Sequence, residues 1–213
     1  MARPLACVLD YGMGNLRSVA KSLEAAGAKV AVSDSRRALS RGDLLVLPGQ
    51  GSFGAAAGVL KAKGLAGFVK EWIAEGRAYL GICLGLQLLF EMSEEGEGGP
   101  GLGVLGGRVK KFAFNGSTTL KVPHMGWNQV QQQATRNKQP LCPLLKDIPD
   151  ESFFYFVHSY YAAPADRAVT AAETDYGGRF ASMVWRERLF ATQFHPEKSQ
   201  AVGLRLLSNF LAL

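Results

Sequence analysis

The chain has 213 residues, of which 47% are hydrophobic, a formal net charge of +6 and an isoelectric point near 9.3. This length suits one α/β domain spanning residues 1–213, and no apolar run reaches the roughly 18–20 residues that a membrane span needs. No aromatic residues interleave with the basic clusters at residues 36–41 and 110–111, so the charge indicates a solvated face. We therefore expect neither a nucleic acid nor a membrane among the partners.

The first half of the chain alternates short apolar runs with helical periodicity. Leu5–Leu9 predicts a buried strand, and apolar residues at helical spacing predict a helix between Asn15 and Gly27. Further strands are expected at residues 30–32, 44–47 and 79–82. Between the strands at 44–47 and 79–82 we expect two helices, the second of them at 65–75. Another helix is expected at 87–92. Strands and helices in this alternation predict βαβ units and a mostly parallel sheet.

The second half of the chain has a different pattern: strand-like runs follow one another, with short polar turns in place of helices between them. This pattern predicts an antiparallel extension of the sheet. The expected strands are residues 109–114, 153–157, 169–173, 180–185 and 189–194, and a helix is expected at 200–213.

Cys83 lies in the segment GICLGLQ at residues 81–87, between an expected strand and an expected helix. A nucleophile flanked by glycines two residues away on each side is typical of a sharp strand-to-helix turn that exposes it at the edge of a sheet. The helix dipole there favours a thiolate, and the backbone N–H of Leu84 can donate to an oxyanion. Cys7 and Cys142 fit the alternative of a buried, unreactive cysteine. Three scattered cysteines argue against a disulfide framework and for a reducing, cytoplasmic compartment.

A thiolate nucleophile needs a base, and the chain has three histidines. His195 ends a strand-like run, and Pro196 fixes the backbone between it and Glu197, whose carboxylate can orient the imidazole. We therefore predict Cys83, His195 and Glu197 as a catalytic triad. His158 is the alternative base. No histidine or cysteine pair has zinc-ligand spacing, so no metal is expected.

Residues 49–54, GQGSFG, match a dinucleotide-binding fingerprint, and Glu71 lies at the distance of a ribose-binding carboxylate. Pro48 breaks the smooth passage from strand to helix that such a site needs, and the motif leaves Cys83 without a role. The competing interpretation places a loop beside Cys83, where the backbone N–H of Gln50 or Gly51 joins that of Leu84 in an oxyanion hole. We favour this second interpretation and expect no cofactor.

Taken together, these motifs resemble a known family. GICLGLQ at residues 81–87 and FHPE at residues 194–197 are similar to the two signatures of the class I, triad-type glutamine amidotransferases. DYGMGN at 10–15, LPGQGSFG at 47–54, PHMGWN at 123–128 and HPEKS at 195–199 narrow the resemblance to the glutaminase subunits of imidazole glycerol phosphate synthase. The resemblance implies a flavodoxin-like three-layer α/β domain that hydrolyses L-glutamine through a cysteine thioester.

The resemblance also implies a substrate site and a partner. The ammonia would pass to a (β/α)₈-barrel cyclase subunit of histidine biosynthesis, and the oxyanion-loop amide would point the wrong way until this partner binds. Positions matching the family's glutamine contacts are Gly49, Gln87, Glu95, Ser159 and Tyr160. Positions matching its subunit interface are Asn15, His124, Met125, Trp127, Tyr155 and Lys198, with core packing as the alternative for Trp127 and Tyr155.

Two further alternatives remain open from the motifs alone. The chain could supply ammonia to another synthase, of pyridoxal phosphate or anthranilate synthesis, or act without a partner as a peptidase or γ-glutamyl hydrolase. A non-enzymatic redox or binding module would also use a reactive Cys83, but it would not turn over glutamine.

Overall fold

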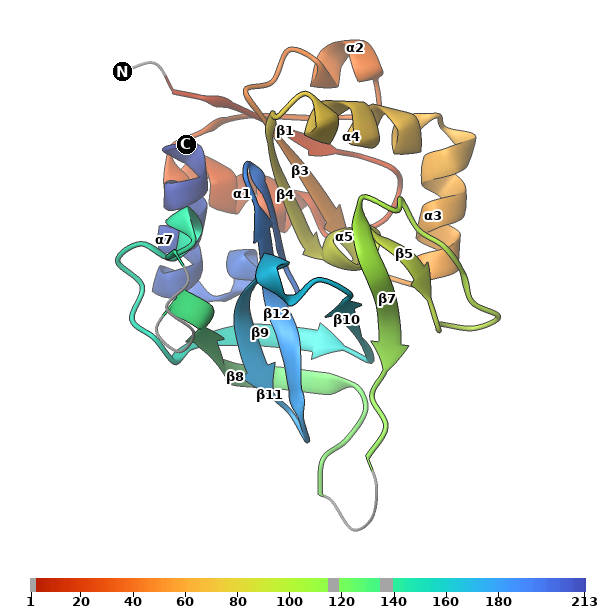
Figure 1. Ribbon diagram of the computed structural model, residues 1–213. Coiled ribbons are helices and arrows are strands. Elements are labelled where there is room, and N and C mark those ends of the chain that lie inside the picture. The colour runs from red at the N-terminus through yellow and green to blue at the C-terminus, as the bar shows by residue number, and fades with distance from the viewer. Residues whose placement is uncertain (1–2, 115–118, 135–139) are drawn as a thin grey trace.

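The computed structural model describes residues 3–114, 119–134 and 140–213, and its centre is a parallel sheet (Figure 1). Five strands run parallel in the order β2-β1-β3-β4-β13. They are β1 (Leu5–Leu9), β2 (Lys29–Ser33), β3 (Leu44–Gly49), β4 (Ala78–Cys83) and β13 (Leu189–Thr192). The first four follow the strands predicted from the apolar runs in the first half of the chain.

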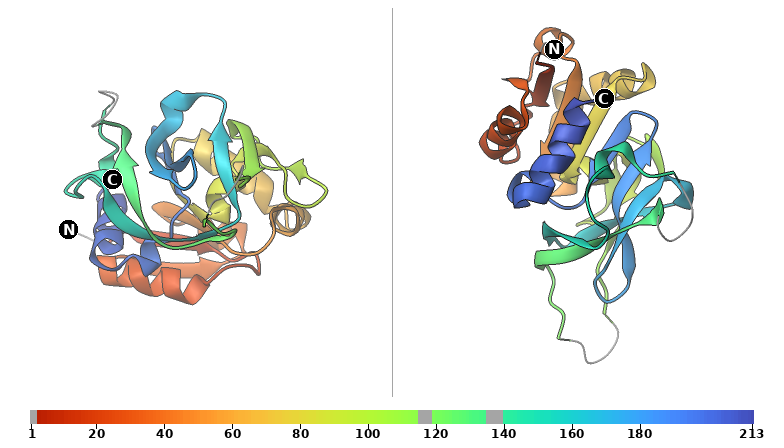
Figure 2. Two further views of the ribbon diagram at one scale, coloured as in Figure 1. Left: turned by 90° about the horizontal axis from the view of Figure 1, so that it is seen from below. Right: turned by 90° about the vertical axis from the view of Figure 1, so that its left-hand side faces the viewer.

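Helices cover both faces of this parallel sheet (Figures 1 and 2). Because side chains alternate along a strand, Ala6 and Val8 of β1 pack into the core beneath α1 and α7, whereas Cys7 and Leu9 pack into the core beneath α3 and α4. The helices are α1 (Leu16–Ala26), α2 (Arg36–Leu39), α3 (Phe53–Ala62), α4 (Leu65–Ala74), α5 (Leu84–Gln87) and α7 (Gln200–Leu211). Short 3₁₀ turns occupy Pro143–Leu145, Arg167–Val169 and Pro196–Lys198.

Beyond β13 the sheet continues in the predicted antiparallel extension. β12 pairs antiparallel with β13, β10 with β12 and β7 with β10, while β11 pairs with β12 and leads through β8 to β9. At the far edge β5 pairs parallel with β7 and antiparallel with β6. These strands are β5 (Phe90–Ser93), β6 (Gly99–Pro100), β7 (Leu105–Lys111), β8 (His124–Gln132), β9 (Ser152–His158), β10 (Tyr160–Pro164), β11 (Thr170–Asp175) and β12 (Arg179–Arg186).

The structure therefore confirms the α/β fold with a parallel central sheet, but several elements differ from the prediction, and β8 and β10 were not predicted at all. The predicted helix at 87–92 is wrong: α5 is a single turn that ends at Gln87, and the chain enters β5 at Phe90. Leu88, Leu89 and Phe90 are all fully buried, so their apolar run has no periodicity that separates helix from strand. Tertiary pairing decides instead, because Phe90 lies opposite Leu105 of β7.

β7 also begins earlier than the strand predicted at 109–114, and it ends at Lys111. Gly106 and Gly107 weaken the strand pattern there. A Cβ atom at Gly107, whose φ is 117°, would overlap the carbonyl oxygen of Ala163 on β10, so glycine permits the close approach of the two strands.

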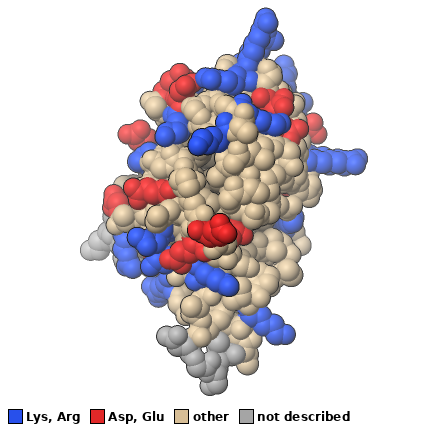
Figure 3. All heavy atoms as spheres, turned by 90° about the vertical axis from the view of Figure 1, so that its right-hand side faces the viewer, with Lys and Arg blue, Asp and Glu red and all other residues tan. Residues whose placement is uncertain are grey.

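On the face shown in Figure 3, Lys and Arg side chains are interspersed with Asp and Glu. Exposed ion pairs join Arg36 to Glu71 at 2.6 Å and Lys63 to Asp34 at 3.0 Å. None of the helices in the described ranges has the length and apolar character to cross a membrane.

Candidate functional site

Cys83 is the last residue of β4 and immediately precedes α5. Its backbone has φ 55° and ψ −104°, a strained conformation for a residue with a Cβ atom. The surroundings impose this conformation: a Cβ atom on Gly81 would lie 2.6 Å from the carbonyl oxygen of Gly85, and one on Gly85 would overlap the carbonyl oxygen of Leu47. The backbone of the turn therefore packs directly against neighbouring backbone, and in this strained conformation the thiol lies at the carboxyl edge of the sheet.

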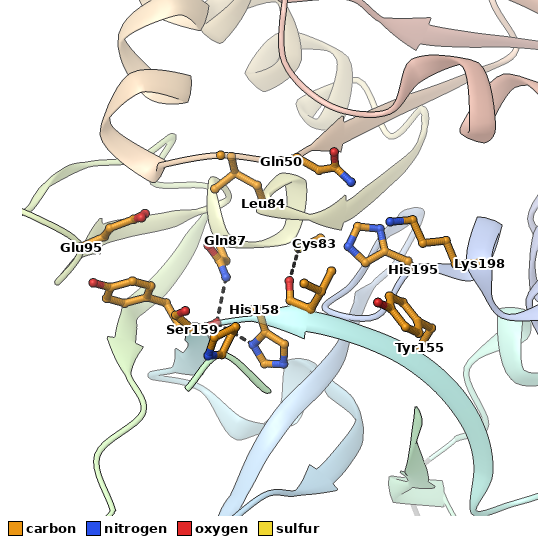
Figure 4. Close-up of a pocket in the computed structure, with 14 residues that line it drawn as sticks. Gln50, Cys83, Leu84, Gln87, Glu95, Tyr155, His158, Ser159, His195 and Lys198 are labelled. Atoms are coloured by element: carbon orange, nitrogen blue, oxygen red, sulfur yellow. Dashed lines mark hydrogen bonds between the residues drawn. The ribbon is translucent and has the colours of Figure 1, made fainter. Parts of the chain in front are cut away.

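His195 lies beside Cys83 in Figure 4, although 112 positions separate the two along the chain. Its Nδ1 atom is 2.7 Å from Oε1 of Glu197, and both side chains are almost completely buried. The 3₁₀ turn that starts at Pro196 places Glu197 next to the ring, and Ser199 Oγ donates to the carbonyl oxygen of His195 at 2.7 Å. Nε2 is buried without a hydrogen-bond partner among the described residues, which leaves it available to the thiol.

The electrostatic balance at His195 favours a charged imidazole. Burial alone lowers the pKa of His195, but the Cys83 thiol and the Glu197 carboxylate outweigh burial and raise that pKa above its ordinary value. An imidazole held in this way can accept the proton of the thiol and later return it to a leaving group.

His158, the alternative base, is engaged elsewhere. Its Nδ1 atom lies 2.8 Å from the carbonyl oxygen of Tyr160, and its Nε2 atom lies 3.0 Å from Nδ1 of His124. Burial lowers the pKa of His158 to about 3, so the ring is neutral with both nitrogens occupied. The geometry therefore favours His195 as the base.

The thiol of Cys83 faces a pocket of about 440 Å³, a volume suited to a small polar molecule (Figure 4). The loop after β3 forms part of the wall through Gln50 and Gly51, so this loop lies beside Cys83. Gly51 has φ 104°, and a Cβ atom there would lie 2.8 Å from Cε of Met13. The residues lining the pocket are Gln50, Gly51, Cys83, Leu84, Gln87, Glu95, Pro123, Tyr155, Val157, His158, Ser159, Tyr160, His195 and Lys198.

Four of the five predicted glutamine contacts line this pocket. Gln87 donates from Nε2 to the carbonyl oxygen of Tyr160 at 2.9 Å. Glu95 lies farther from the thiol (Figure 4), and its Oε2 atom accepts from the backbone N–H of Phe53 at 2.6 Å. Gly49 is the exception: it is buried behind the wall, where an added Cβ would lie 2.6 Å from Cβ of Leu84.

The predicted interface residues fall into two groups. Met125 and Trp127 on β8 are 62% and 46% exposed, so core packing does not account for Trp127. Tyr155, on β9, lies opposite Trp127, and Nζ of Lys198 lies 5.6 Å from the centre of the Tyr155 ring. This group lies beside the pocket, since Tyr155 and Lys198 also line it.

The side chains of the other two interface candidates make contacts within the chain. Asn15 caps α1, its Oδ1 atom accepting from the N–H of Ser18 at 3.2 Å. His124 is only 3% exposed, and its imidazole packs between the rings of Phe156 and Tyr176.

Gln193 is a polar residue at this site that the motifs did not single out. It is fully buried, and its Nε2 atom donates to Sγ of Cys83 at 3.6 Å. The available signal was its position two residues before His195 in a strand-like run, which places both side chains on one face. No group of three or more His, Cys, Asp and Glu side chains arranged to hold a metal occurs within the described part of the chain.

Similarity to known proteins points to the same family as the motifs. Residues 7–213 match the family model described as glutamine amidotransferase class-I. The chain is 49% identical over 213 residues to the imidazole glycerol phosphate synthase subunit HisH of Aromatoleum aromaticum, covering 96% of each chain. It is 50% identical over 211 residues to the HisH subunit of Chromobacterium violaceum, again covering 96% of each.

Among solved structures, the chain resembles one in the structure of PurLQS from Thermotoga maritima, with a TM-score of 0.73 at 20% identity over 99% of each chain. A crystal structure of a glutamine amidotransferase gives a TM-score of 0.72 at 18% identity, covering 97% of this chain and 99% of that one. At such identities these likenesses support the fold alone, which is the flavodoxin-like fold that the motifs predict.

Proposed function

We propose that this chain, which belongs to the class I glutamine amidotransferases and within them to the family of imidazole glycerol phosphate synthase HisH subunits, hydrolyses L-glutamine to glutamate and ammonia with Cys83, His195 and Glu197. The observation that carries the residue assignment is the buried 2.7 Å contact between His195 and Glu197 behind an imidazole that lies beside Cys83. No cofactor is needed for this chemistry.

The reaction proceeds through a covalent thioester. The thiolate of Cys83 attacks the side-chain amide carbon of glutamine, and His195 protonates the amide nitrogen, so that the carbon–nitrogen bond breaks and ammonia leaves the thioester. His195 then takes a proton from water, which attacks the thioester and releases glutamate, while Glu197 stabilises the imidazolium. The N–H groups of Leu84 and of Gln50 or Gly51 stabilise the oxyanion at each stage, and one such donor contributes about a hundredfold or more in rate.

The amino-acid head group of glutamine lies at the end of the pocket away from the thiol. Glu95 meets the ammonium there, using the carboxylate oxygen that Phe53 leaves free, and Gln87 and the backbone of Ser159 and Tyr160 hold the rest. Gly49 acts from behind the wall by letting the loop approach Leu84 closely.

The ammonia passes to a cyclase subunit with a (β/α)₈ barrel, which makes imidazole glycerol phosphate and an aminoimidazole carboxamide ribonucleotide in histidine biosynthesis. The names of the relatives support this partner, and so does the exposed apolar surface of Met125 and Trp127 beside the pocket. The cyclase docks there, next to Tyr155 and Lys198, in the cytoplasm, whose reducing conditions keep thiols such as Cys83 free.

The loop at Gln50 and Gly51 turns its amide into the pocket only when the cyclase is bound. Glutamine hydrolysis by the lone subunit should then be slow and should rise on addition of the cyclase. Equal rates with and without the cyclase would refute this gating of the loop, but would leave the hydrolysis itself standing.

The decisive test of the function compares two sources of nitrogen. Cys83→Ala should abolish glutamine-dependent synthesis by the complex but leave synthesis fed with an ammonium salt intact. Cys142→Ala, a change at a buried cysteine remote from the pocket, is the matched control and should keep both activities. If Cys83→Ala loses both activities, Cys83 serves folding or assembly instead of catalysis.

A further inference from the structure

Gln193 lies on the segment that joins β13 to His195, and its side chain is fully buried. Its Nε2 atom donates to Sγ of Cys83 at 3.6 Å. We propose that Gln193 is a further residue of the catalytic machinery, whose amide positions the sulfur of Cys83 and stabilises it as the thiolate that attacks the substrate. This inference rests on the proposed glutamine hydrolysis and deepens it, because it concerns the same nucleophile.

The orientation of the Gln193 amide is fixed by its other partner. Nε2 of Gln87 donates to Oε1 of Gln193 at 3.2 Å. Since an amide oxygen only accepts and an amide nitrogen only donates, this contact requires the oxygen of Gln193 to face Gln87 and its nitrogen to face the sulfur. A flipped amide would set two N–H groups against each other in a buried site.

Gln87 is held in turn by the carbonyl oxygen of Tyr160, which accepts from it at 2.9 Å and from Nδ1 of His158 at 2.8 Å. Because Nδ1 of His158 donates, its Nε2 accepts from Nδ1 of His124 at 3.0 Å. Nε2 of His124 then accepts from the side-chain amide of Asn128 at 3.2 Å. Every ring and amide from β8 to the sulfur therefore has a single orientation, which gives Gln193 no alternative rotamer that satisfies its partners.

The sulfur has reason to need this donor. Cys83 is 7% exposed, so few water molecules can solvate its ionised form. As a thiol, Cys83 can donate its hydrogen to the carbonyl oxygen of Val157, which lies 4.0 Å from Sγ. A carbonyl oxygen cannot donate a hydrogen bond, so it does not stabilise the thiolate. A hydrogen-bond donor stabilises the charged form of the group that accepts from it, and the amide of Gln193 supplies that donor from a fixed position.

The test measures the nucleophile without any glutamine. Iodoacetamide alkylation of Cys83 in the full chain is followed between pH 5 and pH 10 by mass spectrometry of the peptide that contains it. Cys7 and Cys142 are buried, and burial raises the pKa of both thiols, so their reaction is slow and is resolved on separate peptides. Gln193→Met keeps the volume but removes the donor, and Gln193→Glu keeps an acceptor for Gln87 without donating to sulfur.

For Gln193→Met we expect the pH of half-maximal alkylation to rise by about one unit, the weak end of the range for a hydrogen bond to a charged group, because 3.6 Å is long. For Gln193→Glu we expect a larger rise, because the carboxylate also places a like charge beside the thiolate. The kcat of glutamine hydrolysis in the complex should fall about tenfold, with KM within about threefold. Thr192→Val is the matched control. Thr192 directly precedes Gln193, and the change removes a buried hydrogen bond to the carbonyl oxygen of Phe194 without touching the sulfur of Cys83.

Coincident alkylation curves for wild type and both Gln193 variants would overturn the proposal, as would an equal shift in Thr192→Val. Failure of the proposed function would look different. The wild-type complex would then not hydrolyse glutamine at all, while the shift in alkylation would still report the contact between Gln193 and Cys83.

Discussion

Replacing Gly81 by alanine tests whether the turn that presents Cys83 depends on backbone packing beneath it. Gly81 lies in β4 between two neighbouring strands, opposite Leu47 of β3 and Ala191 of β13. A Cβ atom there would lie 2.6 Å from the oxygen and 2.8 Å from the carbon of the Gly85 carbonyl. Because β4 is paired on both sides, the turn that follows Cys83 must move instead of the strand.

The size of the effect follows from these distances. Carbon–oxygen contacts in proteins settle near 3.3–3.6 Å, so the turn must move by roughly half an ångström or more. Overpacking a core costs about 1–3 kcal/mol. The added Cβ atom meets backbone, which cannot move aside by changing rotamer, so we expect Gly81→Ala to lower the free energy of unfolding by about 3 kcal/mol. For a chain of this length that lowers Tm by about 6–12 °C. Displacement of the nucleophile on this scale should also lower kcat about tenfold or more.

Calorimetry gives the change in Tm, and iodoacetamide alkylation reports whether Cys83 keeps its exposure and reactivity. Gly58→Ala is the matched control: Gly58 lies within α3, and nothing is within 4 Å of an added Cβ. In a helix interior alanine should stabilise by up to about 1 kcal/mol. If Gly81→Ala unfolded at the wild-type temperature with wild-type alkylation, the turn would not be held by the packing of Gly81 against Gly85.

Three further predictions concern the base, the buried histidines and the exposed surface of β8. Glu197→Gln should lower kcat for glutamine hydrolysis by a hundredfold or more in steady-state assays, because an amide keeps a contact with Nδ1 of His195 but no longer stabilises the imidazolium; an unchanged kcat would exclude the triad. Burial lowers the pKa of His124 to about 4 and that of His158 to about 3, so as the pH falls below about 6.5 the unfolded chain binds protons before the native one. The free energy of unfolding in urea should therefore fall by about 5 kcal/mol between pH 6.5 and pH 4, roughly half of it from each histidine, and a flat profile would contradict the neutral pair. Trp127→Ala should weaken binding of the cyclase about tenfold or more in titration calorimetry, whereas Val32→Ala, at an exposed position on the opposite edge of the sheet, should not.

The parallel core could be predicted because its information is local. β1 and β3 are buried on both faces, so they read as continuous apolar runs, and the alternation with α1 implies crossover connections. The turn at Cys83 was visible for a similar reason: the two flanking glycines are needed by contacts within the motif itself, between Gly81 and Gly85.

Elements whose structure depends on distant partners escaped prediction. The run from Leu88 to Phe90 is buried on all sides, and only its pairing with β7 makes it a strand. The contacts of Gln193 could not be predicted from its neighbours either, although its place two residues before His195 was a signal, because Gln87 lies 106 positions away and the sulfur of Cys83 lies 110 positions away. His124 lies in the most specific motif, yet its buried side chain meets His158, whereas the neighbouring Met125 is exposed.

The site also shows why its parts come from two kinds of sheet. The ends of β3, β4 and β13 lie side by side in the parallel sheet, and they lead to the loop at Gln50 and Gly51, to Cys83 and to His195. Tyr155, Val157 and Tyr160, on β9 and β10, form the opposite wall, and these strands belong to the antiparallel extension. Cys83 and His195 are thus held by the most buried strands, whereas the opposite wall of the pocket belongs to the antiparallel extension, in which β8 pairs with β9 and exposes Met125 and Trp127.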